Sequence, residues 1–146
     1  MNVRLYILGV IAAMAIVMSG CDKKDCNGDL DGMWQLTEWR DKNNDVKATK
    51  EDMIFYSFQL QMASFRKNGG QIFLRSSLEV NPEQIRLFKF IESTENGHDK
   101  IMQSMSDPLI KEVGVPEDGI LRIQTLTGGS MVLKTNNQDI LSFRKY

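Results

Sequence analysis

The sequence predicts an all-β fold of short antiparallel strands, in a barrel or a sandwich, on three observations. Several segments alternate apolar and polar residues with a period of two, which is typical of strands that bury one face. Turn sequences rich in glycine and asparagine separate these segments. Helix signals are confined to residues 107–118, with Pro108 near the start and Gly114 and Pro116 at the end. This pattern favours antiparallel β architecture over alternating α/β, and a closed barrel removes the exposed edges of a flat sheet.

The first 20 residues have the three-part layout of a secretory signal peptide. Arg4 supplies one positive charge, residues 5–17 are uncharged and mostly apolar, and small residues lead up to Cys21. The apolar stretch is shorter than the roughly 20 residues that a helix needs to cross a bilayer. We therefore expect residues 1–20 to be a cleaved leader, and not a permanent membrane span.

The residues Ser19-Gly20-Cys21 resemble a bacterial lipoprotein box, in which the cysteine thiol receives a diacylglycerol and becomes the first residue of the mature chain. Met18 stands where leucine is usual. We expect Cys21 to carry the lipid that attaches the protein to the outer membrane, at its periplasmic face or at the cell surface. Two or three acyl chains hold a small domain stably, because each buried CH₂ contributes about 0.8 kcal/mol. The alternatives are an unmodified Cys21 thiol and a Cys21–Cys26 disulfide.

The chain without its leader suits one domain on a short tether. Residues 21–29 are polar and are expected to be the tether, and residues 30–146 the barrel domain. Because Arg4 is the one charged residue of the leader, the mature chain has 17 basic and 19 acidic residues, a net charge of −2. This balance argues against a nucleic-acid partner. If Cys21 is lipidated, Cys26 has no partner within the chain and is expected to be idle; the alternative is a disulfide between two molecules.

Seven strands are predicted along the domain, and the first follows a turn at Asp31-Gly32. The segments are residues 33–39, 54–62, 71–80, 84–92, 119–126, 131–135 and 140–145. Turn residues at 67–70 join the second and third segments as a hairpin. Asn81-Pro82 ends the third, and turns at 127–130 and 136–139 separate the last three. Residues 100–105 are an eighth strand, a loop or a helical turn.

Two short motifs at opposite ends of the domain carry a family resemblance. Gly32-Met33-Trp34 at the start of the first strand resembles the G-x-W motif of lipocalins and related calycin barrels, and Arg144 matches the basic residue that covers that tryptophan. With residues 30–36 and 141–146, the chain resembles small lipocalin-like lipoproteins of Bacteroides-type bacteria over residues 30–146. The resemblance implies an up-and-down barrel of about eight strands with Gly32, Trp34 and Arg144 at its floor.

The chemistry of these residues suits a barrel floor. Trp34 is a large apolar plate with one N–H donor, and a guanidinium stacked on its face contributes about 0.5–2 kcal/mol. We expect Arg144 to stack on Trp34 from the rim, since Phe143 and Arg144 point to opposite faces of their strand. The alternative is that Trp34 is ordinary core and Arg144 is solvated.

A small eight-stranded barrel either fills its interior with side chains or holds one small ligand. If a cavity exists, the apolar strand faces are expected to line it, namely Tyr56, Phe58, Leu60, Met62, Ile72, Leu74 and Leu78. Tyr56 and Ser76 are candidates for the few polar groups that orient a ligand. The alternative is a packed core.

The sequence gives no support for catalysis, a cofactor or a metal site. His98 is the only histidine and lies in a polar turn, and the methionines are scattered. Nucleophile-elbow, phosphate-loop and zinc-helix motifs are absent from the sequence. The predicted function is therefore a lipid-anchored envelope protein that binds a small apolar or amphipathic ligand. The alternatives are a structural or assembly subunit with a packed barrel, and an enzyme or inhibitor with a polar pocket near His98.

Overall fold

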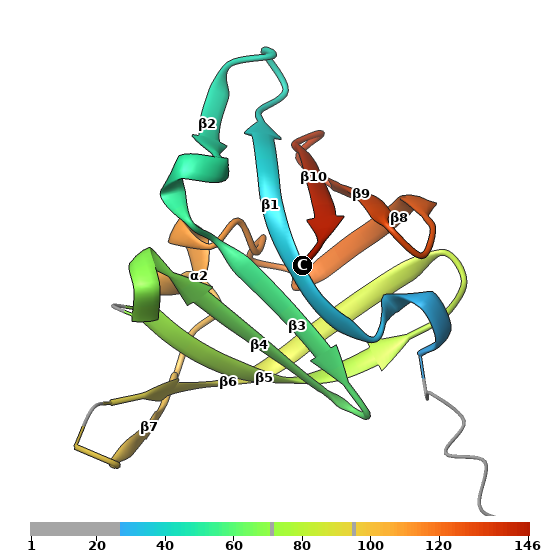
Figure 1. Ribbon diagram of the computed structural model, residues 1–146. Coiled ribbons are helices and arrows are strands. Elements are labelled where there is room, and N and C mark those ends of the chain that lie inside the picture. The colour runs from blue at the N-terminus through green and yellow to red at the C-terminus, as the bar shows by residue number, and fades with distance from the viewer. Residues whose placement is uncertain (1–26, 71, 95) are drawn as a thin grey trace, which may run out of the picture.

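Eight antiparallel strands close into a barrel in the computed structural model, which describes residues 27–70, 72–94 and 96–146 (Figure 1). The strands follow one another around the ring, and the last pairs back with the first, so the predicted up-and-down barrel is confirmed. They are β1 (Gly32–Arg40), β3 (Phe55–Gln59), β4 (Met62–Lys67), β5 (Ile72–Val80), β6 (Gln84–Ser93), β8 (Ile120–Leu126), β9 (Ser130–Thr135) and β10 (Ile140–Lys145).

The remaining elements are short and lie at the edges of the ring. Strand β2 (Val46–Thr49) pairs with the end of β1, and β7 (Asp99–Ile101) pairs with the end of β6. One short helix, α2 (Pro108–Glu112), lies in the segment with the predicted helix signals, and the Asp107 carboxylate caps it by accepting from Leu109 N at 3.0 Å. The 3₁₀ turns are η1 (Gly28–Leu30), η2 (Lys50–Asp52) and η3 (Asn68–Gly70). No helix in the described residues is long and apolar enough to cross a membrane.

The predicted single strand over residues 54–62 is wrong. The structure ends β3 at Gln59, makes a two-residue turn at Leu60 and Gln61, and starts β4 at Met62, so that β4 separates β3 from β5. Leu60 takes a left-handed φ of 56°, which glycine, asparagine or aspartate usually supplies in such turns. Without one of these residues the turn has no sequence signal, and the strand alternation runs on unbroken through it.

A bulge in β6 changes which of its side chains face inward. Lys89 has a left-handed φ of 54°, and the pairing of β5 with β6 slips at this point. Leu87 and Phe90 are both buried as a result, although strict alternation places residues three apart on opposite faces.

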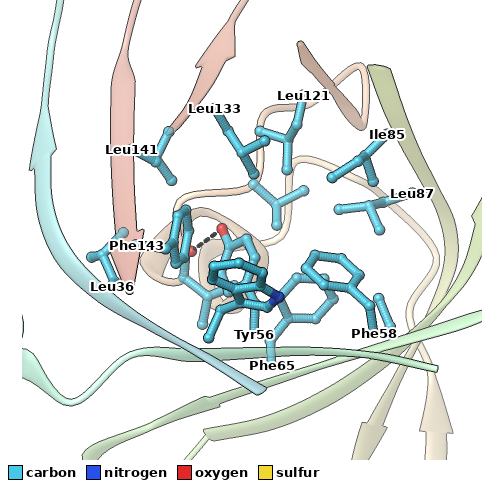
Figure 2. Packing of buried hydrophobic residues seen from close by; sticks show 14 of the residues in the cluster. Leu36, Tyr56, Phe58, Phe65, Ile85, Leu87, Leu121, Leu133, Leu141 and Phe143 are labelled. Carbon is cyan, nitrogen blue, oxygen red and sulfur yellow. Dashed lines mark hydrogen bonds between the residues drawn. The ribbon is translucent and has the colours of Figure 1, made fainter. Parts of the chain in front are cut away.

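Side chains fill the interior of the barrel. Figure 2 shows residues of opposite walls meeting at its centre, with Tyr56 among them. The rings of Tyr56 and Phe65 lie 4.7 Å apart, those of Tyr56 and Phe143 also 4.7 Å, and those of Phe65 and Phe90 5.5 Å. Each large apolar side chain contributes about 1.5–3 kcal/mol when it is fully buried. The alternative of a packed core is therefore what the structure shows.

Candidate functional site

The residues predicted to line a cavity fall into three groups. Tyr56, Phe58, Leu74 and Leu78 are buried in the barrel, as their alternation predicts, but they pack against other side chains. Ile72 is partly buried at the edge of this core. Leu60 and Met62 are 61% and 48% exposed, because the turn between β3 and β4 reverses the chain at this point, so their placement in the interior is wrong.

Trp34 closes one end of the barrel, which we call the floor. Its indole is fully buried, and Nε1 donates a hydrogen bond to the Leu30 carbonyl at 2.8 Å. The Lys145 Nζ lies over the indole, 4.9 Å from the ring centroid, and donates to the Asp29 carbonyl at 2.9 Å. Gly32 leaves room for this lysine, since a Cβ there would lie 2.9 Å from Lys145 Cε.

Arg144 does not cover Trp34, so the predicted stack is corrected to Lys145. Trp34 and Lys145 are directly opposite on β1 and β10, which places their side chains on the same face. Arg144 points to the other face, where its Nε and Nη2 donate to Gln35 Oε1 at 2.9 and 2.7 Å. The register between β1 and β10 decides which basic residue covers Trp34. The G-x-W motif does not reveal which residue of the last strand pairs with Trp34.

The opposite end is closed by residues 107–118, which we call the plug. The Tyr56 hydroxyl donates to the Val113 carbonyl at 2.6 Å, and this bond is buried. Burial raises the pKa of the Tyr56 hydroxyl above its ordinary value of 10.0. Gly114 has a left-handed φ of 84°, and a Cβ on it would lie 2.7 Å from Leu141 Cδ2. The plug therefore approaches the core closely, and Tyr56 holds it instead of orienting a ligand.

A groove of about 470 Å³ opens beside the plug, and we call it the mouth groove. Its lining includes Trp39, Lys111, Val115, Glu117, Asp118 and Asp139. Trp39 comes from the end of β1, the next four from the plug, and Asp139 from the turn that joins β9 to β10. The mouth groove therefore combines an aromatic wall with three carboxylates and one ammonium group.

The polar groups of the mouth groove hold one another in place. Trp39 Nε1 donates to Asp139 Oδ2 at 3.0 Å, and the Asp139 backbone N–H donates to Thr135 Oγ1 at 3.1 Å. Lys111 Nζ pairs with Glu117 Oε1 at 2.7 Å. The Asp118 carboxylate accepts from Ile120 N at 3.0 Å. These bonds fix the aromatic wall and leave a net negative charge around it.

Comparison with known proteins supports the same architecture. A family model described as a lipocalin-like domain matches residues 16–146. The chain belongs to the lipocalin-like domain family. The lipocalin-like fold is typically a binding fold, and it commonly binds small hydrophobic ligands. A search of curated proteins finds no match.

Solved structures share the lipocalin-like fold with this chain. A lipocalin-like protein from Bacteroides uniformis ATCC 8492 has a TM-score of 0.60 at 19% identity, covering 82% of this chain and 100% of its own. An uncharacterized protein from Bacteroides eggerthii DSM 20697 has a TM-score of 0.59 at 18% identity, covering 80% of this chain and 99% of its own. A protein from Burkholderia xenovorans has a TM-score of 0.50 at 15% identity, covering 88% of this chain and 94% of its own. At these identities the likeness shows the fold alone.

Of the other predicted site residues, the structure describes Ser76 and His98. Cys21 lies outside the described residues. Ser76 is 3% exposed, and its hydroxyl has no hydrogen-bond partner among the described residues. His98 is exposed in the turn before β7, where its carbonyl accepts from Thr94 Oγ1. Within the described part of the chain, no group of three His, Cys, Asp or Glu side chains is arranged to hold a metal ion.

Sequence reasoning missed Trp39 and the plug as parts of a site. The helix signals of residues 107–118 gave the local structure of the plug, but not the end of the barrel that it covers. Trp39 carries no motif, and its role depends on Asp139, which is 100 residues away in the chain.

Proposed function

We propose that this lipocalin-like protein is anchored to the outer membrane by a lipid on Cys21 and binds a small amphipathic molecule in the mouth groove. The observation that carries the binding proposal is a fixed Trp39 in a groove of about 470 Å³, beside an interior that is already full. Ligand pockets commonly span about 300–1,000 Å³ and combine apolar walls with a few placed polar groups.

The charges of the mouth groove suggest the chemistry of the ligand. The three carboxylates outnumber the one ammonium group, and Lys111 is already paired with Glu117. An indole face attracts cations by about 0.5–2 kcal/mol. A ligand with a cationic head and an apolar tail therefore fits this groove better than an anionic one.

The binding proposal is tested with two detergents that share one tail. Decyltrimethylammonium and decyl sulfate, both below their micelle concentrations, are titrated into the protein while tryptophan emission is followed. We expect a saturable change with the cation and none with the anion, and Trp39→Phe should abolish it while Trp34 still reports. Equal responses to both detergents, or a response that survives Trp39→Phe, would contradict the proposal.

The anchor proposal rests on the leader and on Cys21. Cys21→Ala should release the protein from the membrane fraction, and mass spectrometry of the wild-type N-terminal peptide should show the added acyl chains. Cys26→Ser is the matched control and should leave the protein in the membrane fraction. An unmodified Cys21 in the mature protein would refute the anchor.

A structural or assembly subunit of an envelope complex is the second candidate, and the filled interior favours it. In that case neither detergent should bind saturably. Cross-linking in intact cells should then recover one reproducible partner, and the yield should not depend on Trp39.

A further inference from the structure

Asn27 is held by hydrogen bonds at the floor end of the barrel. Asn27 Nδ2 donates to the Leu60 carbonyl at 2.8 Å and to Asp31 Oδ1 at 2.6 Å. The predicted tether of residues 21–29 is therefore shorter, because residues 27–29 belong to the folded domain. Six Cα–Cα steps of up to about 3.5 Å each lead from Cys21 to Asn27, so a lipid on Cys21 keeps Leu60 within roughly 20–25 Å of the membrane.

Exposed apolar side chains gather at the same place. A groove of about 530 Å³ is lined in part by Asn27, Leu60, Val80, Phe88 and Lys89. A second groove of about 270 Å³ shares Lys89 and adds Met62 and Ile91. We call the side chains of Leu60, Met62, Val80, Phe88 and Lys89 the tether-side face.

Leu60 is an unusual residue for its position. It is the first residue of a two-residue turn, has a left-handed φ of 56°, and leaves 61% of its surface exposed. Glycine or asparagine supplies this backbone shape at lower cost, and a polar residue avoids the exposure of apolar surface. The packing of the barrel gives no reason for leucine here, which indicates a contact outside the domain.

Lys89 gives the tether-side face a cation that the barrel does not neutralise. Its Nζ lies 5.9 Å from the centroid of the Phe88 ring, and no carboxylate within the described residues forms an ion pair with it. Nearby Arg86 is different, because it pairs with Glu79 at 3.1 Å. A lysine with its stem along apolar side chains and its ammonium group free is suited to lipid phosphates at a membrane interface.

We propose that the tether-side face rests on the bilayer that holds the lipid of Cys21, with Leu60 at the acyl boundary and Lys89 at the phosphates. This inference rests on the proposed anchor. It also fixes an orientation, because the tether-side face lies at the floor end and the mouth groove at the other. In Figure 1 the turn between β3 and β4 is at the bottom and β2, beside the end of β1, is at the top. The mouth groove therefore faces away from the membrane.

The test compares one position at each end of the barrel. Leu60→Cys and Val46→Cys are made separately in the acylated full chain carrying Cys26→Ser, and each thiol receives an environment-sensitive fluorophore. Val46 on β2 is the matched control, because it is also apolar and 47% exposed. The proteins are reconstituted into vesicles of phosphatidylethanolamine and phosphatidylglycerol at 3:1, with and without nitroxide-labelled lipid.

We expect the nitroxide lipid to quench the probe at position 60 several-fold more than the probe at position 46. Adding Lys89→Glu should reduce the quenching at position 60. Equal quenching at both positions in acylated protein would overturn the membrane contact and leave the anchor standing. An unacylated Cys21 with protein free in solution would overturn both. A blue shift at position 60 that needs no vesicles and grows with protein concentration would assign the face to a second copy of the chain, and would also overturn the inference.

Discussion

The floor and the plug close opposite ends of the barrel with different kinds of contact. At the floor, Trp34 bonds to a carbonyl only four residues earlier in the chain, and Lys145 covers its ring. At the plug, the bond between Tyr56 and Val113 joins residues 57 positions apart, within the core. The floor is therefore a local motif with a charged cover, whereas the plug depends on backbone brought close to the core.

This difference has consequences for stability and for function. The plug backbone at Gly114 packs directly against Leu141, because a Cβ on Gly114 would lie only 2.7 Å from Leu141 Cδ2. A larger residue at this position therefore displaces the plug. The floor has a lysine at its surface, which can move without disturbing the core. We expect substitutions at the plug to lower the free energy of unfolding more than substitutions at the floor.

Gly114→Ala should lower the free energy of unfolding more than the other substitutions below. The new Cβ meets Leu141 Cδ2 at 2.7 Å and requires a left-handed φ, so we expect a loss of about 2–4 kcal/mol in the free energy of unfolding. Urea unfolding measures it. Gly128→Ala is the matched control, because no atom lies within 4 Å of its Cβ position, and it should change stability by less than about 0.5 kcal/mol. Similar midpoints for the two variants would contradict a tightly fitted plug.

Tyr56→Phe should cost about 1–3 kcal/mol at neutral pH, because it leaves the buried Val113 carbonyl without its donor. Its ring packing with Phe65 and Phe143 should persist. A variant as stable as the wild type in urea would show that the hydroxyl does not hold the plug.

Tyr56 should also give stability a pH dependence. Its pKa is raised in the folded state, so above about pH 10 the unfolded chain loses this proton and the folded chain keeps it. The contribution of the Tyr56 hydroxyl to the free energy of unfolding is therefore fully present below about pH 10. Above that pH it falls by up to about 1.4 kcal/mol per pH unit. Tyr56→Phe should flatten the fall, and Tyr146→Phe, which removes an exposed hydroxyl, should leave it unchanged.

Lys145→Met should lower the free energy of unfolding by about 1 kcal/mol, since it removes the cation over Trp34 and the hydrogen bond to the Asp29 carbonyl. In a Trp39→Phe background, where Trp34 alone emits, it should also shift the emission spectrum. Arg144→Met is the comparison, and it should leave the Trp34 emission unchanged because Arg144 lies on the other face of β10. A shift with Arg144→Met and none with Lys145→Met would reverse the assignment.

Leu60→Gly should raise stability by about 0.5 kcal/mol, because glycine takes the left-handed φ of this turn without steric cost. Thermal unfolding measures the gain. Gln61→Gly is the control, since Gln61 is outside the left-handed region and gains nothing from glycine. A loss of stability with Leu60→Gly would mean that the leucine side chain packs usefully on the barrel.

The sequence was sufficient for features that depend on local pattern. Strand alternation, turns and the G-x-W motif predicted the all-β barrel, and the signals around Pro108 predicted a short helix. The sequence was insufficient for features that depend on the pairing register of strands distant in the chain. The turn at Leu60 has no turn-forming residue, so β4 was missed, and the bulge at Lys89 changes the inward face of β6. The mouth groove joins Trp39 to Asp139 where β10 pairs back with β1, a contact between residues 100 positions apart that no spacing in the sequence reveals.

A barrel with a full interior leaves the mouth groove as the place where a ligand binds. The two tryptophans report on the two ends, because Trp34 Nε1–H lies at the floor and Trp39 Nε1–H at the groove. The most direct measurement is a titration of the ¹³C,¹⁵N-labelled protein with decyltrimethylammonium, following both indole N–H resonances and the methyl resonances of Leu74 and Leu141. We predict that the Trp39 resonance moves saturably and the Trp34 resonance stays in place. Movement of the Trp34 resonance together with the methyl resonances of Leu74 and Leu141, with Trp39 unchanged, would place the ligand inside the barrel and contradict binding at the mouth groove.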